Sequence, residues 1–507
     1  MKAGIDFGTT FSLIARLQPD GTPILVPDAV FKDRYSTPSS IYLGDGTALT
    51  GRQAEVKFET YPDQVQLLSF IKRHFGSGAP VAYDATGSAW YAESLAALLL
   101  KKLRNDAELH AGQELSAAVL TVPAHFNDRQ RKSAQLAAAL AEIPLLGLLD
   151  EPVAAAMHYG MEAGTSRNGK IIFVYDFGGG TFDATVLTFD EQGMYVLAKD
   201  GHPHLGGREF DDIVQSMIVE QIEMDAGANF RWSSFSHLQL RRAAEEVKMA
   251  LSETGSFFVR KNIFVGSWRK EMTFNREQFE KKAYAIIEQT IEICRRCLSE
   301  AGLKPSDIND FLLVGGSSMI PAVRNLLAAG LPIAPEKIHL HQPLSAVAFG
   351  AALRAAQLSG SSETLHLPPE FRGVTGYHVG FRVVDSNTGQ VKLDTILRKN
   401  LPLPCKGMRT YFTRSESQQS ILLDMVQYLE SPDDAVSVGQ ISIGPIYHSM
   451  ANYAVEVSVE NSADGRLHIQ AFDPQTGREV RHTFQNSDTE AALLLEQKAL
   501  VATTLIS

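Results

Sequence analysis

The sequence predicts an α/β protein with two similar lobes, followed by a smaller antiparallel β domain. Three observations predict this organisation. Strand-like and helix-like runs alternate up to about residue 355, which is typical of α/β domains. One strand–turn–strand pattern occurs around Asp6 and again around Asp176, so we expect two lobes that face each other. Near residues 358–369 the composition changes, and apolar and polar residues alternate beyond it.

The individual elements follow from local patterns. Residues 117–122 and 171–176 are short apolar runs with polar, glycine or proline residues at their ends, which predicts buried strands. Residues 130–140 and 238–251 have apolar residues at helical spacing. We therefore expect domain 1–357, a linker at 358–370 that contains small polar residues and two prolines, a β-sandwich at 371–486, and a short helix at 487–507.

Composition limits the function. The chain has 507 residues, of which 44% are hydrophobic and 21% charged, so it can bury large cores and is not disordered as a whole. With 47 Lys and Arg against 58 Asp and Glu, its net charge is −11. Nucleic acid is therefore not the expected main ligand, because a phosphate backbone requires a basic surface.

Cysteine usage and the apolar runs bear on the compartment. Three cysteines, Cys294, Cys297 and Cys405, cannot form a disulfide framework, so we expect a reducing, cytoplasmic location. Cys294 and Cys297 form a CxxC pattern in a helix-like run. We interpret them as small helix residues rather than as zinc or redox ligands. No signal-peptide pattern and no apolar run of 18 residues is found, so no membrane partner is expected.

Two glycine turns are candidates for phosphate binding. Backbone N–H groups approach a phosphate closely where glycine removes the Cβ atom. Either turn alone also fits an ordinary β-hairpin. Here, however, the turn occurs twice, and each time an aspartate stands just before it. The residues of the two turns are Gly8, Thr9 and Thr10, and Gly178, Gly179, Gly180 and Thr181.

The aspartates beside these turns are candidates for a metal site. Mg²⁺ keeps most of its water ligands and takes few carboxylates, so carboxylates near a triphosphate can hold it through water. We expect Asp6, Asp176 and Asp183 to do so. A third turn, Gly315-Gly316-Ser317, is a candidate corner for base and ribose, and a plain βα turn is the alternative.

Several segments resemble the DnaK-type heat shock protein 70 chaperones, in the order and at the spacing of that family. They are DFGTTFS from Asp6, TVPAHFND from Thr121, DEPVAAA from Asp150, DFGGGTFD from Asp176, HLGG from His204 and LVGGS from Leu313. The likeness runs from residue 3 to about 356. Residues 396–404 and 463–479 are similar to segments of the family's peptide-binding domain. Among these chaperones the chain resembles the short bacterial paralogues without a helical lid, similar to the HscC-like subgroup.

The resemblance implies an actin-like two-lobed ATPase fold with ATP or ADP and Mg²⁺ in a deep cleft. It implies a β-sandwich that grips unfolded or extended client peptide, slow ATP hydrolysis, and partners of the J-domain and nucleotide-exchange type. The residues that match the hydrolytic positions of the family are Lys72, Glu151, Thr181 and Asp183. In-line phosphoryl transfer depends on positioning and electrostatics at such residues.

Further positions are carried over from the resemblance. Pro123 and Arg131 match the proline switch and the relay arginine that couple the nucleotide state to the peptide domain. Alternatively, Pro123 is only the turn at a strand end, and Arg131 is only an exposed helix residue. For the groove residues the alternative is the core of the β-sandwich. Besides the turns, the implied nucleotide contacts are Phe11, Gly206, Gly207, Glu245, Lys248, Ser252 and Met319, and the implied groove residues are Leu393, Phe412, Ile421 and Leu422.

The sequence departs from the family at several positions. His125 replaces a tyrosine, Met319 an arginine that stacks on the base, and Leu344 an aspartate that caps a helix, a role we expect Ser345 to take over. These changes predict weaker nucleotide affinity. In the linker, Leu365 and Leu367 remain of a leucine run, which leaves the coupling of the domains open. Asp424 falls where an apolar inward residue is expected, and unpaired burial would be costly there.

The helical lid of the family is missing from the pattern, which predicts fast peptide release and a narrow set of clients. Three alternatives to an ATP-driven chaperone are considered. A nucleotide-gated adaptor with little hydrolysis is favoured by the departures and disfavoured by the retained hydrolytic residues. A metabolite kinase would not need the β domain, and an actin-like filament would be hindered by it.

Overall fold

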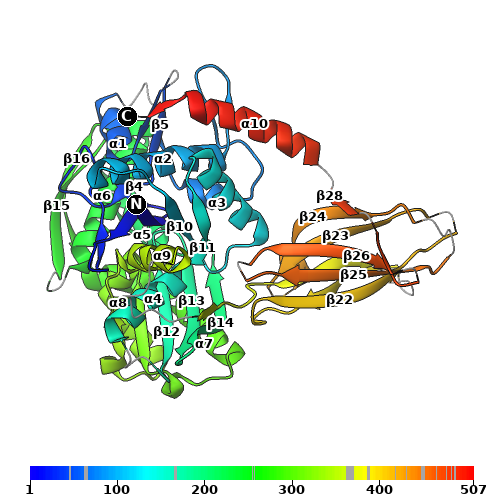
Figure 1. The fold of residues 1–507 in the computed structure, drawn as a ribbon. Helices are drawn as coiled ribbons and strands as arrows, with labels where there is room; N and C mark the ends of the chain where they lie inside the picture. Colours follow the sequence, from blue (N-terminus) through cyan, green and yellow to red (C-terminus); the bar gives the residue numbers. More distant parts are fainter. Residues whose placement is uncertain are drawn as a thin grey trace.

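The computed structural model describes the chain except residues 45–46, 62–66, 165–167, 254, 256, 361–369, 385–388, 417, 430, 447–450, 464, 476, 481, 485–486 and 507. It consists of an α/β body in two lobes and an elongated β domain that projects from the body (Figure 1). In the described residues, no helix is long and apolar enough to cross a membrane.

The first lobe is built on a mixed sheet in the order β11-β10-β1-β2-β3, with β4 paired to β2. Its strands are β1 Lys2–Phe7, β2 Phe11–Leu17, β3 Pro23–Leu25, β4 Thr37–Pro38, β10 Ala117–Val122 and β11 Leu145–Asp150. The helices are α1 Arg52–Thr60, α2 Ala92–Ala111 and α3 Asp128–Leu140. Smaller strands are β5 Ile41–Leu43, β6 Thr47–Thr50, β7 Leu67–Leu68, β8 Ala82–Tyr83 and β9 Ala89–Trp90. Buried leucines and alanines of α2 pack with the sheet to form the core of this lobe.

The second lobe repeats this plan with the strand order β18-β17-β12-β13-β14-β19. Its strands are β12 Ile171–Phe177, β13 Phe182–Phe189, β14 Gly193–His202, β17 Asp310–Val314, β18 Ile338–Leu340 and β19 Glu370–Arg372. A hairpin, β15 Phe258–Val265 with β16 Trp268–Asn275, lies at its outer end. The helices are α5 Gly207–Ala226, α6 Ser234–Ser252, α7 Arg276–Glu300 and α8 Pro321–Gly330. Aromatic side chains of β12 and β13 form the centre of its core.

Two helices cross between the lobes. They are α4 Glu151–Ala163, which follows β11 directly, and α9 Ala346–Leu358. They pack so closely that a Cβ on Gly350 would lie 1.8 Å from the carbonyl oxygen of Ala154. Only glycine fits this crossing, and the rest of the α4–α9 contact is made largely by alanines. The two lobes are thus joined through a tight helix pair.

The β domain is a sandwich of two antiparallel sheets, in the orders β21-β20-β23-β24-β28 and β22-β25-β26-β27. Alternating residues such as Val455, Val457 and Val459 are buried between the sheets, which agrees with the alternation in the sequence. The strands are β20 His378–Val384, β21 Val391–Leu397, β22 Cys405–Phe412, β23 Ile421–Tyr428, β24 Val436–Ile443, β25 Ala454–Asn461, β26 Leu467–Asp473, β27 Arg478–Val480 and β28 His482–Phe484.

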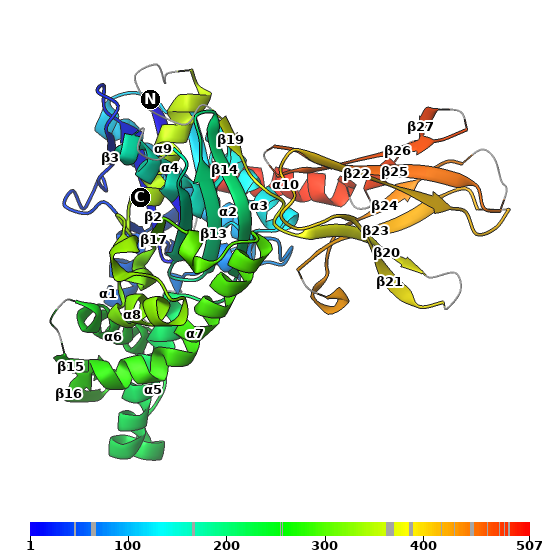
Figure 2. The same cartoon turned by 90° about the horizontal axis from the view of Figure 1, so that it is seen from below.

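Two segments join the domains in ways that the sequence does not predict. Residues 370–372, placed by composition at the border of linker and β domain, form β19 and pair in parallel with β14 of the second lobe (Figure 2). Leu365 and Leu367 of the expected linker lie outside the described residues. After the sandwich, α10 Ser487–Thr503 runs back to the first lobe, and β29 Leu505–Ile506 pairs with β6 (Figure 1).

Candidate nucleotide site

The two glycine turns lie against each other at the bottom of the interface between the lobes. One turn joins β1 to β2 and the other joins β12 to β13, and both strand pairs are antiparallel. A Cβ on Gly179 would lie 2.3 Å from Thr10 Oγ1, and one on Gly180 would lie 2.6 Å from Thr9 Cγ2. The glycines are therefore required by the close approach of the turns. Within the second turn, Gly178 N–H donates to the carbonyl oxygen of Thr181 at 3.1 Å.

A cluster of four carboxylates and one lysine lies beside the turns. Asp176 and Asp183 are buried, as are Lys72 and Glu151, whose Nζ and Oε1 atoms are 2.5 Å apart. Asp6, at the end of β1, accepts a hydrogen bond from Thr121 Oγ1 at 3.3 Å. Of the predicted hydrolytic and metal residues, the structure brings these five groups together.

The charges in this cluster do not balance. The pKa of Glu151 is raised to about 7, mainly by burial. The charges of Asp6 and Asp183 raise this pKa as well, and the charge of Lys72 partly opposes the increase. Burial and the neighbouring carboxylates also raise the pKa of Asp176 well above its usual value. Burial is the main cause of a raised pKa at Asp6 as well. Four carboxylates around one lysine form a donor set that fits a hydrated Mg²⁺ ion, which would supply the missing positive charge.

His125 belongs to this cluster, although the sequence marks it only as a departure from the family. Its Nδ1 lies 2.9 Å from Asp183 Oδ1, and its backbone N–H donates to the same oxygen at 3.1 Å. Its Nε2 atom is buried and has no hydrogen-bond partner among the described residues. The signal in the sequence was the histidine in the TVPAHFND segment, directly after a strand that ends at the cleft.

Arg73 is a second residue that sequence reasoning missed. Its Nη2 donates to the carbonyl oxygen of Gly180 at 2.8 Å and lies 3.2 Å from Glu209 Oε1. Glu209 in turn accepts the N–H of Gly206 at 2.7 Å. The guanidinium therefore holds the second glycine turn against the start of α5. Its only sequence signal is its place next to Lys72.

The predicted base and ribose residues also converge. Ser317 Oγ donates to the carbonyl oxygen of Gly178 at 2.7 Å, so the third turn packs on the second. Gly207 lies between Ser317 and Lys248, because a Cβ on it would be 3.1 Å from Ser317 Oγ and 3.3 Å from Lys248 Nζ. Lys248 Nζ forms an ion pair with Asp211 Oδ1 at 2.7 Å. Burial raises the pKa of Asp211 to about 6, against the lowering effect of Lys248.

The remaining predicted nucleotide residues lie at the rim of this corner or on α6. Glu245 and Ser252 are half-buried on α6, and Ser252 Oγ donates to the carbonyl oxygen of Lys248 at 2.8 Å. Met319 is 44% exposed and Phe11 37% exposed, so neither side chain is held in a core. The exposed Met319 cannot supply the planar cation that the family places there.

The capping role expected of Ser345 is wrong. Ser345 occupies the N-cap position of α9, but its side chain makes no capping hydrogen bond. Its hydroxyl donates to Gln342 Oε1 at 3.0 Å instead, so it is not available to a backbone N–H of the helix. Leu344, in place of the family's aspartate, contacts Gly316, since a Cβ there would lie 3.6 Å from Leu344 Cδ2.

The residues expected to couple the domains form a series of contacts that leads toward the β domain. Pro123 is buried at the end of β10, and its carbonyl accepts the Phe126 N–H at 3.1 Å. Arg131 donates to Asp150 Oδ1 at 2.6 Å, and Lys199 donates to Asp150 Oδ2 at 2.7 Å. Burial alone would raise the pKa of Asp150, but the two cations outweigh it and lower that pKa. Asp150 directly precedes Glu151 at the start of α4.

The β domain contacts this series of coupled residues directly. Gln427 Oε1 accepts the backbone N–H of Asp128 at 2.8 Å, and the hydroxyl of Tyr377 donates to the carbonyl oxygen of His125. Asn400 Oδ1 accepts the N–H of Lys199 at 3.1 Å. The β domain thus reaches His125 and Lys199, the residues that contact Asp183 and Asp150.

The predicted groove residues are placed differently from one another. Phe412 and Leu422 are each 56% exposed, and Leu393 is half-buried. Ile421 is 6% exposed and belongs to the sandwich core, because consecutive strand residues point to opposite faces. Ile421 therefore cannot line the outer surface with Leu422, which corrects its assignment to the groove.

Asp424 is not the unpaired inward carboxylate that the sequence suggested. It lies on the same strand face as Leu422, and the inward positions are taken by Leu423 and Met425. Arg382 Nη1 donates to its Oδ2 at 2.7 Å, and Ser437 Oγ donates to its Oδ1 at 2.5 Å. The expected register was therefore wrong by one residue.

The CxxC cysteines behave as helix residues. Cys294 and Cys297 are fully buried on α7 in the core of the second lobe. Burial raises the pKa of both thiols well above the usual value, so they stay protonated. This placement agrees with the interpretation from the sequence.

Comparison with known proteins gives the class of protein. The model of the Hsp70 protein family matches residues 77–499. The chain therefore belongs to the Hsp70 family of chaperones. It is 31% identical over 488 residues to the chaperone protein DnaK of Thermosipho melanesiensis, a match that spans 94% of this chain and 78% of that protein.

Proposed function

We propose that this chain hydrolyses ATP to ADP and phosphate between the two lobes and couples the reaction to binding extended peptide segments of client proteins in the cytoplasm. The observation that carries the proposal is the buried group of Lys72, Glu151, Asp6, Asp176 and Asp183 beside two glycine turns. Membership of the Hsp70 family supports the ligand and the activity.

The glycine turns would bind the phosphates through backbone N–H groups, as their close approach leaves no room for side chains. Asp6, Asp176 and Asp183 would hold a hydrated Mg²⁺ ion, which neutralises phosphate charge when bound. Lys72 is placed to stabilise charge on the terminal phosphate. Glu151, with a pKa of about 7, can accept or return the proton of a water molecule near neutral pH.

His125 and Thr181 would assist through position. The hydrogen bonds from His125 fix the carboxylate of Asp183, so that it cannot rotate away from the cleft. Thr181 closes the second turn through its backbone carbonyl, and its hydroxyl would supply a contact to water in the cleft. Catalysis of this kind consists mainly of positioning and electrostatic stabilisation.

Coupling would run from Glu151 through Asp150 to Arg131 and on to the β domain. Asp150 and Glu151 are consecutive, so a shift of one moves the other. The contact between Gln427 and the first turn of α3 supplies a direct mechanical link. Partners of the J-domain and nucleotide-exchange type would act on this link, as the family implies.

We further propose a narrow set of clients and fast peptide release. Two observations support this. On the outer face of β23, Asp424 is paired with Arg382 and shares its face with the exposed Leu422, so this surface is only partly apolar and favours less apolar peptide segments. The helix α10 packs on α2 and α3 of the first lobe instead of lying along the exposed Phe412 and Leu422.

The experiment is steady-state ATP hydrolysis of the full chain, with and without an unstructured apolar peptide. We expect slow turnover that rises with peptide and falls about 10²–10³-fold in Lys72→Ala, the loss typical of removing one charge-stabilising group. Lys32→Ala, on the exposed surface, is the matched control. Turnover that Lys72→Ala leaves intact would contradict the assignment.

A second candidate is a nucleotide-gated adaptor that binds ATP and hydrolyses little. The exposed Met319 and Leu344, which replace polar groups of the family at the base corner, favour it. The same assay distinguishes the two: bound ATP without turnover in the parent chain would establish the adaptor.

A further inference from the structure

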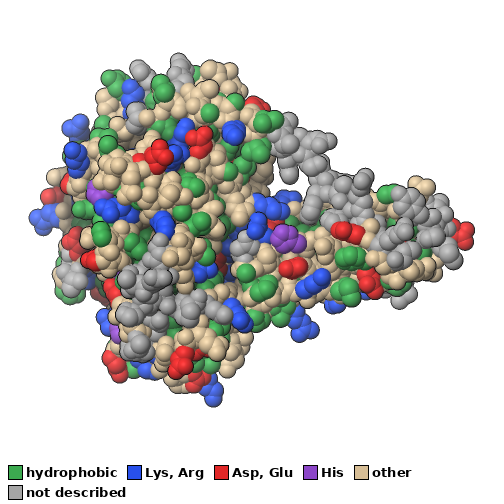
Figure 3. All heavy atoms as spheres, viewed as in Figure 1, with side chains coloured by type: hydrophobic (Ala, Val, Ile, Leu, Met, Phe, Trp, Pro, Cys, Tyr) green, Lys and Arg blue, Asp and Glu red, His purple; other side chains and the backbone are tan. Residues whose placement is uncertain are grey.

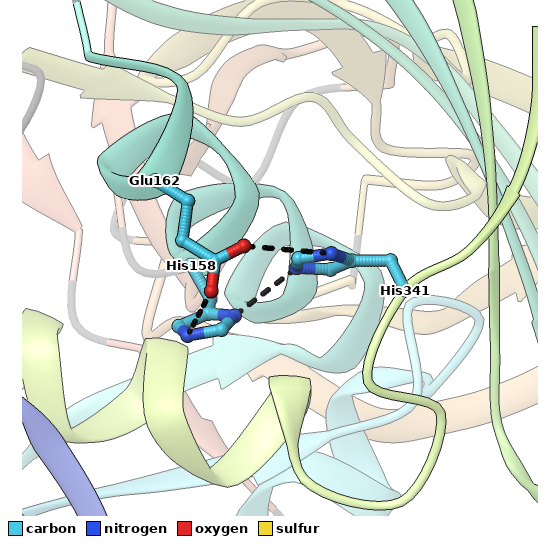
Figure 4. Close-up of side chains that lie close together, drawn as sticks. All are labelled: His158, Glu162 and His341. Atoms are coloured by element: carbon cyan, nitrogen blue, oxygen red, sulfur yellow. Dashed lines mark hydrogen bonds and ion pairs between the residues drawn. The ribbon is translucent and has the colours of Figure 1, made fainter.

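The second lobe holds a cluster of two histidines and a glutamate away from the nucleotide cleft. His158 and Glu162 lie one turn apart on the same face of α4, and His341 follows β18 (Figure 4). We call this group the His–Glu–His cluster. From it we propose a binding site for one first-row divalent metal ion, with Zn²⁺ the best match, separate from the Mg²⁺ site.

One hydrogen bond joins the two rings of the cluster, and the carboxylate lies beyond hydrogen-bond distance of both rings. His158 Nδ1 and His341 Nε2 are 3.1 Å apart, a distance that one hydrogen bond explains. The carboxylate oxygens of Glu162 lie 3.6 Å from His158 Nε2 and 3.8 Å from His341 Nδ1. Both separations are too long for hydrogen bonds. Ligands of one tetrahedral Zn²⁺ ion lie about 3.3 Å apart, given bonds of about 2.0–2.1 Å.

One ligand atom from each residue lies within 4.8 Å of the other two, so separations that shorten by up to about 1.5 Å would bring all three onto one ion. The two rings are held by neighbours: the His158 centroid lies 5.1 Å from that of Phe349, and the His341 centroid lies 5.4 Å from that of Tyr159. These contacts restrict the rings to orientations that face the carboxylate.

The chemistry of the cluster selects the metal. Two imidazoles and one carboxylate form a donor set that suits Zn²⁺ and disfavours Mg²⁺, which takes oxygen ligands. The side chain of His158 is 3% exposed and that of Glu162 is 47% exposed, so an ion can enter from the solvent side and keep a water ligand there.

A metal ion here would link two elements that border the nucleotide site. The helix α4 begins at Glu151. His341 is followed closely by Pro343, whose carbonyl oxygen accepts the Gly315 N–H at 2.9 Å. Bound metal would therefore hold the base corner to the middle of α4. The proposal does not depend on ATP hydrolysis by this chain.

The test is Zn²⁺ binding to the full chain after treatment with a chelator, measured by competition with a chromogenic zinc indicator and by the thermal unfolding midpoint. We expect one Zn²⁺ per chain and a raised midpoint, because a ligand of the folded state stabilises it. Glu162→Gln should weaken binding at least tenfold, and His341→Gln should do the same. The matched controls are Glu142→Gln and His110→Gln, on exposed side chains.

The outcomes are distinct. Unchanged Zn²⁺ affinity in Glu162→Gln would overturn the proposal, and this variant decides alone if His341→Gln fails to fold, because Glu162 is half-exposed. Co²⁺ substitution provides a second readout. An absorption spectrum of tetrahedral Co²⁺ without a thiolate charge-transfer band supports binding at the His–Glu–His cluster. A thiolate band would assign the metal to the cysteines and would overturn the proposal.

Discussion

At the scale of single residues, the buried pair of Lys72 and Glu151 is the feature with the largest consequence. Its 2.5 Å contact involves Glu151, which directly follows Asp150, the partner of Arg131. The glycines and aspartates could be predicted from the repeated turn, because closely packed turns require glycine, and Lys72 could be predicted only from the resemblance to the family. The contacts of His125 with Asp183 and of Arg73 with Gly180 could not, because they depend on how the lobes pack.

The raised pKa of Glu151 predicts a pH dependence of stability. Its pKa is about 7 in the folded chain and 4.5 ordinarily, so the folded state binds this proton more tightly than the unfolded state. The stabilisation is complete below about pH 4.5 and is lost as the pH rises through about 7, by on the order of 3 kcal/mol. In Glu151→Gln, the unfolding midpoint in EDTA should fall less between pH 5 and pH 8 than in the parent chain.

The control for this measurement is Glu142→Gln, whose side chain is 67% exposed and which should keep the parent's pH dependence. An equal fall in the midpoint of Glu151→Gln and parent would mean that other groups, such as Asp176, carry the dependence.

At the scale of elements, the placement of α10 is the main difference between expectation and structure. The helix itself follows from its Ala- and Leu-rich sequence. Its docking does not, because β29 pairs with a strand near the other end of the chain. Val501 of α10 is fully buried in the core of the first lobe, and Gln497 Nε2 donates to the carbonyl oxygen of Ala89 at 3.0 Å.

Val501→Ala should therefore destabilise the first lobe by about 1–3 kcal/mol, since it removes two buried methyl groups and leaves a cavity. Hydrogen exchange of the α10 amides should increase at the same time. Leu495→Ala on the same helix, at a side chain that is 70% exposed, should change neither quantity. Unchanged exchange in Val501→Ala would show that the docking of α10 does not depend on this side chain.

At the scale of the whole molecule, the order of domains could be predicted and their arrangement could not. Alternation of apolar and polar residues identifies the strands of a sheet, but it does not indicate which surface of the lobes the β domain packs against. On the face shown in Figure 3, Lys and Arg side chains lie among Asp and Glu side chains over the two α/β lobes, so charge alone does not mark a docking surface there. The arrangement instead depends on single polar contacts, such as that of Gln427 with Asp128.

The last prediction tests that contact, and it rests on the proposed function. Gln427→Ala removes the acceptor of the buried Asp128 N–H. The unpaired N–H destabilises the docked arrangement of the domains, but not the separated arrangement, in which water binds the N–H. Stimulation of ATP turnover by peptide should fall several-fold, while basal turnover stays within about twofold of the parent, because the contact lies outside the cleft. Gln440→Ala, exposed on the neighbouring strand β24, should leave both rates unchanged. Full stimulation in Gln427→Ala would show that β19 and the lysine contacts of the interface, such as Lys399 with Asp200 at 3.2 Å, transmit the signal without it.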